Sequence, residues 1–166
     1  MRKVYLLVIM LSMGFILSSS CSTVVNKIDS KLEKRRVFVI LPFENNTETP
    51  LAGIRVSSMV EGVAMSKGYN VKSDLYFKES KDYTSTEIDN LLRELREKEV
   101  DYVITGSVNE FRYKTGIDGE PAVNIVIKVI DIKSSKIVLV GTGSKTGWSH
   151  ESITTVAQKV INRLLP

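Results

Sequence analysis

The chain has 166 residues, about the length of one domain, and its 43% hydrophobic and 25% charged residues are typical of a globular protein rather than a disordered one. A single Cys excludes an intramolecular disulfide, and one Cys with one His excludes most zinc sites. The net charge is +4, but the chain from Val37 onward has 16 basic and 17 acidic residues, which excludes a basic groove for nucleic acid.

The first twenty residues have the layout of a secretory signal. A short basic start precedes an apolar run over Val4–Leu17, which is too short to span a bilayer comfortably, and three serines then lead to Cys21. This cysteine stands where a bacterial lipoprotein signal has its acylated Cys, although Ser18 occupies the place where such signals prefer Leu. We predict a signal peptide over 1–20 and lipidation at Cys21. The alternative is an ordinary signal peptide whose removal leaves a free thiol.

Residues 21–36 are predicted to be the lipidated Cys and a polar tether. Ser22–Arg36 has five basic and two acidic residues and little periodicity. Its Lys and Arg side chains either rest against anionic lipid headgroups or are solvated, as in an ordinary linker. The folded domain is expected over 37–166.

The domain begins with a strand and a helix. Val37–Leu41 is a continuous apolar run, which is typical of a strand buried on both faces. Thr49 and Pro50 indicate an N-cap and a first helical residue. Gly68 follows the last apolar residues at helical spacing and is expected to end this helix in a left-handed turn.

A second strand and helix follow. Tyr69–Lys72 is a short strand candidate. Thr84 and Glu87 have the spacing of a capping box, so they predict the start of a helix that runs to about Lys98.

The second half of the domain is predicted to be a meander of hairpins and a final helix. The strand-like runs, joined by short Gly or Ser turns, are Asp101–Thr115, Ala122–Lys133 and Ile137–Thr146. Ser149 is expected to cap the last helix, whose apolar residues recur at helical spacing from Ile153 to Leu165. The order β-α-β-α-β-β-β-α predicts an α/β fold with a single sandwich domain, a mixed β-sheet with packed helices.

No segment has the motif of an enzyme site. Gly141–Thr146 is similar to a phosphate-binding loop, but Ser144 stands where the loop needs Gly before Lys145, and strand alternation continues through it. Ser149, His150 and Glu151 are adjacent in sequence, so they cannot converge as a catalytic triad. We expect a protein that is not an enzyme and has no metal or cofactor.

Two segments carry more chemistry than a turn requires. Glu110–Pro121 places five charged and two aromatic residues at a hairpin tip, which is either an edge hairpin protected by charge or a functional surface. Trp148 is the only Trp and lies at an element boundary. It either packs in the core or contacts a membrane or a protein.

Five segments of the chain also match motifs of a known family, in the same order along the sequence. They are Leu41–Asn45, Thr49–Gly53, Thr105–Val108, Phe111–Gly116 with Asp118–Pro121, and Gly147–Ser149. Over about residues 37–166 the chain thereby resembles the PelC family, the outer-membrane lipoproteins of the Pel (pellicle) exopolysaccharide export system. The first segment is the least specific, since it recurs across lipoproteins of related fold. Phe111 stands where the family is associated with Trp.

The resemblance implies a non-enzymatic homo-oligomeric ring, a dodecamer, anchored by lipid such as palmitate to the periplasmic face of the outer membrane. The ring is expected to guide a cationic exopolysaccharide to a PelB-like outer-membrane channel in biofilm formation, because many weak acids in a ring attract a polycation. The alternatives are a lipid-anchored periplasmic activator that docks on a peptidoglycan synthase, which would share the fold, and a subunit of a secretion or flagellar complex.

The resemblance also implies roles for individual residues. Trp148 is expected to contact the membrane. Three residues are expected at a subunit contact or in the pore lining: Phe111, Arg112 and Tyr113. Asp118 and Glu120 are expected to contribute to an acidic face.

Overall fold

A computed structural model of the chain describes residues 22–28, 32–73, 79–113 and 119–166, so Cys21 and Asp118 lie outside the described residues. Within these ranges one mixed sheet has the strand order β1-β7-β6-β5-β2-β4, and β3 pairs with β5. Its strands are β1 (Ser22–Ile28), β2 (Val37–Ile40), β3 (Glu44–Asn45), β4 (Asn70–Val71), β5 (Tyr102–Arg112), β6 (Ala122–Asp131) and β7 (Lys136–Thr146). The helices are α2 (Ala52–Ser66), α3 (Ser85–Glu94) and α4 (Ile153–Leu164), with a 3₁₀ turn, η2 (Leu95–Glu97), after α3. The predicted α/β sandwich is confirmed.

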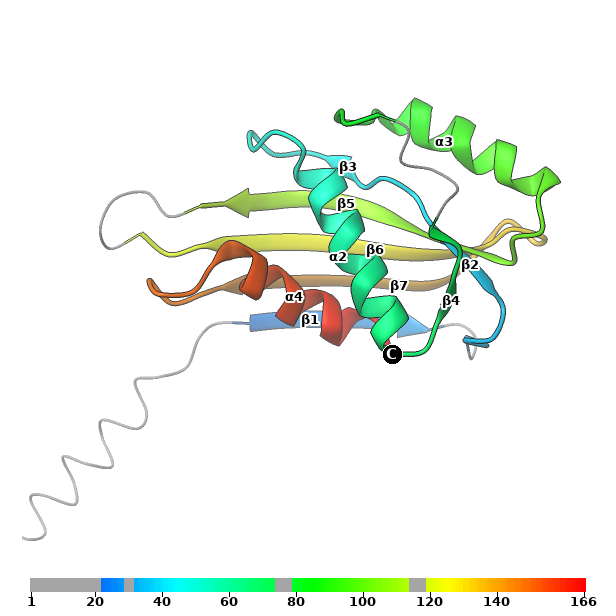
Figure 1. The fold of residues 1–166 in the computed structure, drawn as a ribbon. Helices are drawn as coiled ribbons and strands as arrows, with labels where there is room; N and C mark the ends of the chain where they lie inside the picture. Colours follow the sequence, from blue (N-terminus) through cyan, green and yellow to red (C-terminus); the bar gives the residue numbers. More distant parts are fainter. Residues whose placement is uncertain (1–21, 29–31, 74–78, 114–118) are drawn as a thin grey trace, which may run out of the picture.

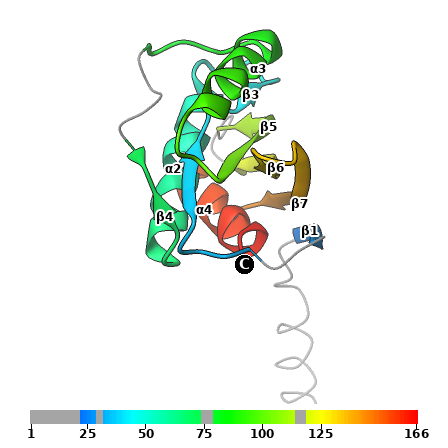
Figure 2. The same cartoon turned by 90° about the vertical axis from the view of Figure 1, so that its right-hand side faces the viewer.

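Helices α2 and α4 cover one face of the sheet (Figures 1 and 2). Alternate residues of β6, from Val123 to Val129, point into this layer and are fully buried, as strand alternation requires. Val156 and Val160 of α4 meet them from above with almost no exposure. This layer forms the larger part of the hydrophobic core.

Helix α3 packs on the opposite face, near the start of β5. Its Ile88 and the following Leu95 contact Val39 and Val103, which form a second, smaller core. No other described helix covers that face, and Ile137 of β7 is 47% exposed there. The fold is therefore two-layered over most of the sheet and three-layered only beneath α3.

The predicted ends of two helices are confirmed. Thr84 Oγ1 accepts from the Glu87 N–H, and the Glu87 carboxylate accepts from the Thr84 N–H at 2.9 Å, which completes the capping box. Hydrogen bonds from Lys81 and then from Thr84 lower the pKa of Glu87 to about 2. After α2, Gly68 adopts φ 83°, the left-handed conformation that glycine adopts without strain.

Two predicted N-caps are wrong. Helix α2 begins after Leu51 and has no side-chain cap, because the Thr49 hydroxyl donates instead to the Phe111 carbonyl oxygen at 2.6 Å. Helix α4 is capped by Ser152, three residues after Ser149, since residues 148–151 first form a turn closed by the Glu151 N–H on the Trp148 oxygen.

The segment predicted to be a tether contributes a strand. Ser22–Ile28 forms β1 and pairs antiparallel with β7 over seven residue pairs, from Ser22 opposite Lys145 to Ile28 opposite Leu139. The open edge of β7 offers backbone donors and acceptors that an adjacent extended chain satisfies, which sequence periodicity does not reveal. No helix of the described residues is long and apolar enough to cross a membrane.

Candidate functional site

One end of the sheet, which we call the proximal end, brings together the segments that the sequence analysis singled out. Arg112 at the end of β5 lies opposite Ala122 at the start of β6, and Ala122 lies opposite Thr146 at the end of β7. Ser22, the first described residue, pairs with Lys145 at the same end. The turn before α4 and the segment between β3 and α2 also lie here (Figure 1).

The proximal end has an open hollow of about 820 Å³. It is lined by residues 46–50 before α2, by Arg55 in the first turns of α2, and by residues 109–113 at the end of β5. The hollow therefore includes Phe111, Arg112 and Tyr113, three residues that the family resemblance marks as functional.

The ring of Tyr113 is held from two sides and remains 49% exposed. Arg55 Nη1 donates to Tyr113 Oη at 2.7 Å. The ring of Phe111 meets it edge to face, with centroids 6.0 Å apart and an interplanar angle of 88°. Phe111 is itself only 2% exposed, so the core supports an aromatic ring at the surface.

Amide side chains form the other wall of the hollow. Asn46 Nδ2 donates to Asn109 Oδ1 at 3.1 Å, and Asn109 Nδ2 donates to Asn124 Oδ1 at 3.1 Å. The Asn46 N–H also donates to the Val108 oxygen at 2.9 Å, next to the β3–β5 pairing. These bonds join the segment before α2 to β5 and β6.

The segment between β3 and α2 is fixed by its own polar groups. Asn45 Oδ1 accepts from the Thr47 N–H and hydroxyl at 3.1 and 2.8 Å. Asp82 accepts from Asn45 Nδ2 at 2.9 Å and from the Leu51 N–H at 3.2 Å. Leu51 adopts φ 61°, a left-handed conformation that costs energy for a residue other than glycine and needs such support. The segment that forms this wall is therefore held by several hydrogen bonds.

Trp148 follows β7 at the same end of the sheet and is 41% exposed. The backbone N–H of Trp148 donates to Glu151 Oε2 at 2.9 Å, and Glu151 also pairs with Lys159 of α4. The hydrogen bond from Lys159 and then that from Trp148 lower the pKa of Glu151, so this carboxylate stays ionised. The backbone of Trp148 is fixed while its indole is free to contact a partner, which opposes the core interpretation.

Gly147 allows the Trp148 turn to approach α4. A Cβ at this position would lie 2.4 Å from Cγ2 of Val156 and 3.1 Å from Cγ of Pro121. The Gly147 N–H donates to the Pro121 oxygen at 2.8 Å, which ties the turn to the start of β6. The Gly-Trp-Ser segment thus has a packing reason for its glycine.

The described residues have no group of three His, Cys, Asp or Glu side chains that could hold a metal ion. Gly141–Thr146 lies within β7, and Lys145 on it is 9% exposed, so this segment is a strand and not a phosphate-binding loop, as predicted.

Comparison with known proteins gives a family for this fold and site. No protein-family model matches the chain, and no curated protein matches it in sequence. Among solved structures, it is similar to the PelC dodecamer from Paraburkholderia phytofirmans, with 29% identity, a TM-score of 0.73 and coverage of 87% of this chain and 96% of that one. A point variant of that dodecamer, in a second crystal form, gives 30% identity and a TM-score of 0.75 with the same coverage. The chain belongs to the PelC family.

A more distant solved structure agrees in fold. The chain is similar to lipoprotein GNA1162 from Neisseria meningitidis, with 13% identity, a TM-score of 0.57 and coverage of 77% of this chain and 96% of that one. At this identity the likeness concerns the fold alone.

In this PelC-family chain the described site residues lie in two places. Phe111, Arg112 and Tyr113 meet at the hollow, where only the last two reach the surface, Arg112 in an ion pair with Glu110 at 3.3 Å. Glu120 is exposed just before Pro121, the residue that binds the Trp148 turn, so it lies at the same end of the sheet as Trp148. Cys21 and Asp118 lie outside the described residues.

Other residues of the hollow were missed by the sequence analysis of this PelC-family chain. Arg55 contacts Tyr113 across 58 residues of sequence, and Asn46 contacts Asn109 across 63, so no local pattern links either pair. The Thr49–Gly53 match to the family was the nearest signal, because this segment joins two walls of the hollow.

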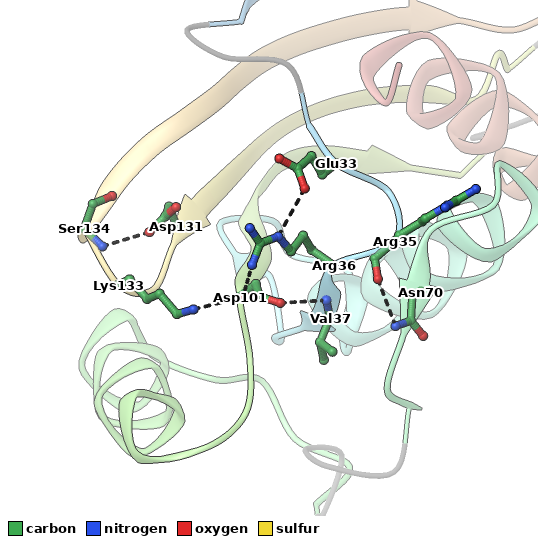
Figure 3. Close-up of polar contacts among 9 residues, drawn as sticks. All are labelled: Glu33, Arg35, Arg36, Val37, Asn70, Asp101, Asp131, Lys133 and Ser134. Carbon is green, nitrogen blue, oxygen red and sulfur yellow. Dashed lines mark hydrogen bonds and ion pairs between the residues drawn. The ribbon is translucent and has the colours of Figure 1, made fainter.

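The distal end of the sheet in this PelC-family fold is held by an ionic network (Figure 3). Asp101, just before β5, accepts from the Val37 N–H at 3.1 Å and pairs with Arg36 at 3.3 Å and Lys133 at 3.4 Å. Burial raises the pKa of Asp101, but the hydrogen bonds from Val37 and Lys133 and the charge of Arg36 outweigh it and lower the pKa overall. The network joins β2, β5 and the β6–β7 turn.

Two basic residues of the predicted tether, Arg35 and Arg36, lie at this distal end. Arg36 is held at the distal end, and the Arg35 oxygen accepts from Asn70 Nδ2 at 3.4 Å (Figure 3). Ser22 lies at the proximal end, about 30 Å away along strands of this length. Arg35 and Arg36 therefore lie at the opposite end of the sheet from Ser22.

Replacing Asp101 with asparagine should lower the free energy of unfolding by about 1–2 kcal/mol at pH 7, because Arg36 and Lys133 each lose one ion pair and an amide accepts less strongly from the Val37 N–H. The folded-state pKa of Asp101 lies below its ordinary value, so its contribution is present above about pH 4 and is lost as the pH falls further. Urea unfolding of both proteins between pH 3 and pH 8 measures the difference. Asp89→Asn on exposed α3 is the matched control, and equal stability of Asp101→Asn and the unchanged chain at pH 7 would contradict the network.

Proposed function

We propose that this PelC-family protein is a non-enzymatic lipoprotein that assembles a ring on the periplasmic face of the outer membrane and guides a cationic exopolysaccharide to its export channel. One observation carries the proposal: the chain matches 96% of a protein that forms a dodecamer, at 30% identity and with the same fold. A PelB-like channel is the proposed partner, and biofilm formation the proposed process.

Lipidation at Cys21 is the proposed anchor. Cys21 directly precedes Ser22, which pairs with Lys145 at the proximal end, so attached acyl chains would leave the fold beside the exposed indole of Trp148. Trp is the residue that prefers the membrane–water interface, and two or three acyl chains give firm attachment where one does not. The proximal end is therefore the proposed membrane side, with Trp148 dipping into the interface.

Charge on the ring is the proposed means of guiding the polymer. Repeated carboxylates around a closed ring raise the local concentration of a polycation without a tight site. Glu120 is exposed at the proximal end, which is the proposed membrane side. We therefore assign it to the rim of the ring opening on that side, and not to the face of the ring that points away from the membrane. Asp118 keeps the same proposed role.

Subunit contacts in a closed ring are heterologous, so each chain uses two different surfaces. Arg112 and Tyr113 are the exposed residues proposed for a contact or for the pore lining, and Phe111 supports them from the core. The two roles for Arg112 and Tyr113 differ in what a substitution changes: a contact residue changes assembly, and a lining residue changes only passage of the polymer.

The stoichiometry of the chain tests this proposal most directly. The protein without residues 1–21 should form a closed ring with the mass of about twelve chains, because the family member with the same fold is a dodecamer. Native mass spectrometry and light scattering over a range of concentrations measure it.

The Asp101→Asn variant, altered at the distal network, serves as a control for effects of stability alone. A monomer at high concentration would contradict the ring and favour the alternative, a periplasmic activator that docks on a peptidoglycan synthase.

A further inference from the structure

The hollow at the proximal end has hydrogen-bonding groups that the fold does not use. Among the described residues, Asn46 Oδ1 has no partner, and Asn109 donates only one of its two amide hydrogens. The carboxylate of Glu48, also in the lining, has no partner among the described residues. These polar groups are therefore available to hydrogen-bond a ligand in the hollow.

The side-chain amides of Asn46 and Asn109 are held in position by the sheet before any ligand arrives. The amide chain of Asn46 and Asn109 runs into the sheet through Asn124, and the segment that carries Asn46 and Glu48 is tied by Asn45 and Asp82. Rotamers that are already fixed lose little entropy on binding, which is the general advantage of a preorganised site.

Tyr113 gives the hollow a flat apolar surface. Its ring is 49% exposed. Its orientation is set by the edge-to-face contact with the Phe111 ring and by the hydrogen bond from Arg55 to its hydroxyl. A pyranose ring has an apolar face of C–H groups that packs on such an aromatic surface, while its hydroxyl and amide substituents need planar polar partners at the side. The hollow offers both within one space.

The charge of the lining is balanced. The lining has two basic residues, Arg55 and Arg112, and two acidic residues, Glu48 and Glu110. A balanced lining does not select a strongly charged ligand through long-range attraction. It suits a ligand recognised through hydroxyl and amide groups at contact distance.

We propose that this hollow is a saccharide subsite, which binds a short segment of polysaccharide by stacking one pyranose ring on Tyr113 and by hydrogen bonds to Asn46 and Asn109. The proposal rests on the proposed function for the presence of a polysaccharide, and it assigns to Tyr113 the lining role rather than the subunit contact. Each copy in a ring then adds one weak contact to the path of the polymer, and repeated weak contacts retain a chain without stopping its passage.

Binding of defined oligosaccharides to the full chain tests the subsite. The probes are the tetramers of N-acetylglucosamine and of glucosamine, observed by saturation-transfer NMR and by titration, with the protein in a detergent that carries no sugar. We expect both tetramers to bind, with affinity that changes less than about threefold between low and high salt, because the lining is balanced. Binding of the free-amine tetramer that strengthens much more than this at low salt would contradict recognition through hydroxyl and amide groups in a balanced lining.

Tyr113→Ala should weaken binding of both tetramers at least about tenfold, whereas Tyr113→Phe should retain it within about threefold, since the ring face remains. Met65→Ala is the matched control, because Met65 is equally exposed, at 49%, and lies at the far end of α2. The absence of any tetramer signal with the unchanged chain, or full binding by Tyr113→Ala, would overturn the subsite.

Native mass of the same samples separates this inference from the ring. If Tyr113→Ala changes the number of subunits, Tyr113 is a subunit contact and the subsite is wrong. A ring that binds neither tetramer leaves the proposed function standing without the subsite. A monomer that binds both tetramers contradicts the ring and retains the subsite.

Discussion

Replacing Cys21 with alanine is expected to release the protein from the membrane fraction almost completely. Once the signal peptide is removed, membrane attachment without the acylated cysteine depends on the exposed Trp148 alone, and one such side chain contributes far less than two or three acyl chains. Fractionation of cells followed by detection of the protein in soluble and membrane fractions measures the release. Metabolic labelling with a fatty acid checks whether the unchanged protein carries lipid.

The same variant isolates the contribution of Trp148. In the Cys21→Ala protein, residual binding to vesicles should fall further when Trp148 is replaced with alanine, and it should not change when exposed Met65 is replaced. Circular dichroism confirms that each variant folds. If a cleaved Cys21→Ala protein stays attached to membranes, the anchor does not lie at Cys21.

Replacing Gly106 with alanine is expected to destabilise the fold by about 3 kcal/mol or more. A Cβ at this position would lie 1.8 Å from the Val126 carbonyl oxygen and 2.8 Å from the ring of Phe43, so backbone in the centre of the sheet must move. Urea unfolding of the protein without residues 1–21 measures the loss, and a native-like midpoint would contradict the close approach.

Gly62 supplies the matched control. It lies in the middle of α2, and a Cβ there would meet no atom within 4 Å. Gly62→Ala should therefore raise the free energy of unfolding by about 0.5–1 kcal/mol, because alanine loses less backbone freedom in a helix than glycine. Opposite signs for the two substitutions separate steric crowding from helix propensity.

Local sequence signals correctly predicted the elements whose stabilising interactions join residues close together in the chain. The capping box at Thr84 and Glu87, the left-handed turn at Gly68 and the buried alternation of β6 each involve residues a few positions apart. The N-caps predicted at Thr49 and Ser149 were wrong. For Thr49 the reason is a long-range contact. The Thr49 hydroxyl donates to the Phe111 carbonyl oxygen, 62 residues away, and a local sequence pattern cannot reveal a contact over that separation.

The candidate site was predicted only in part. Phe111, Arg112 and Tyr113 were singled out because they stand together in a family-like segment with unusual charge and aromatic content. Asn46, Arg55 and Asn109 were not, since their importance comes from lying against that segment in space.

Sequence alone indicated the α/β fold, the order of its main elements from Val37 onward and a resemblance to the PelC family, because hydrophobic periodicity and short motifs are local properties. Tertiary structure decided three other matters. It paired Ser22–Ile28 with β7, it brought the residues of the hollow together, and it separated the start of β1 from the bases near Arg36 by the length of the sheet. Each of these depends on which strand edges and faces meet, and backbone pairing of that kind leaves no periodic trace in the chain.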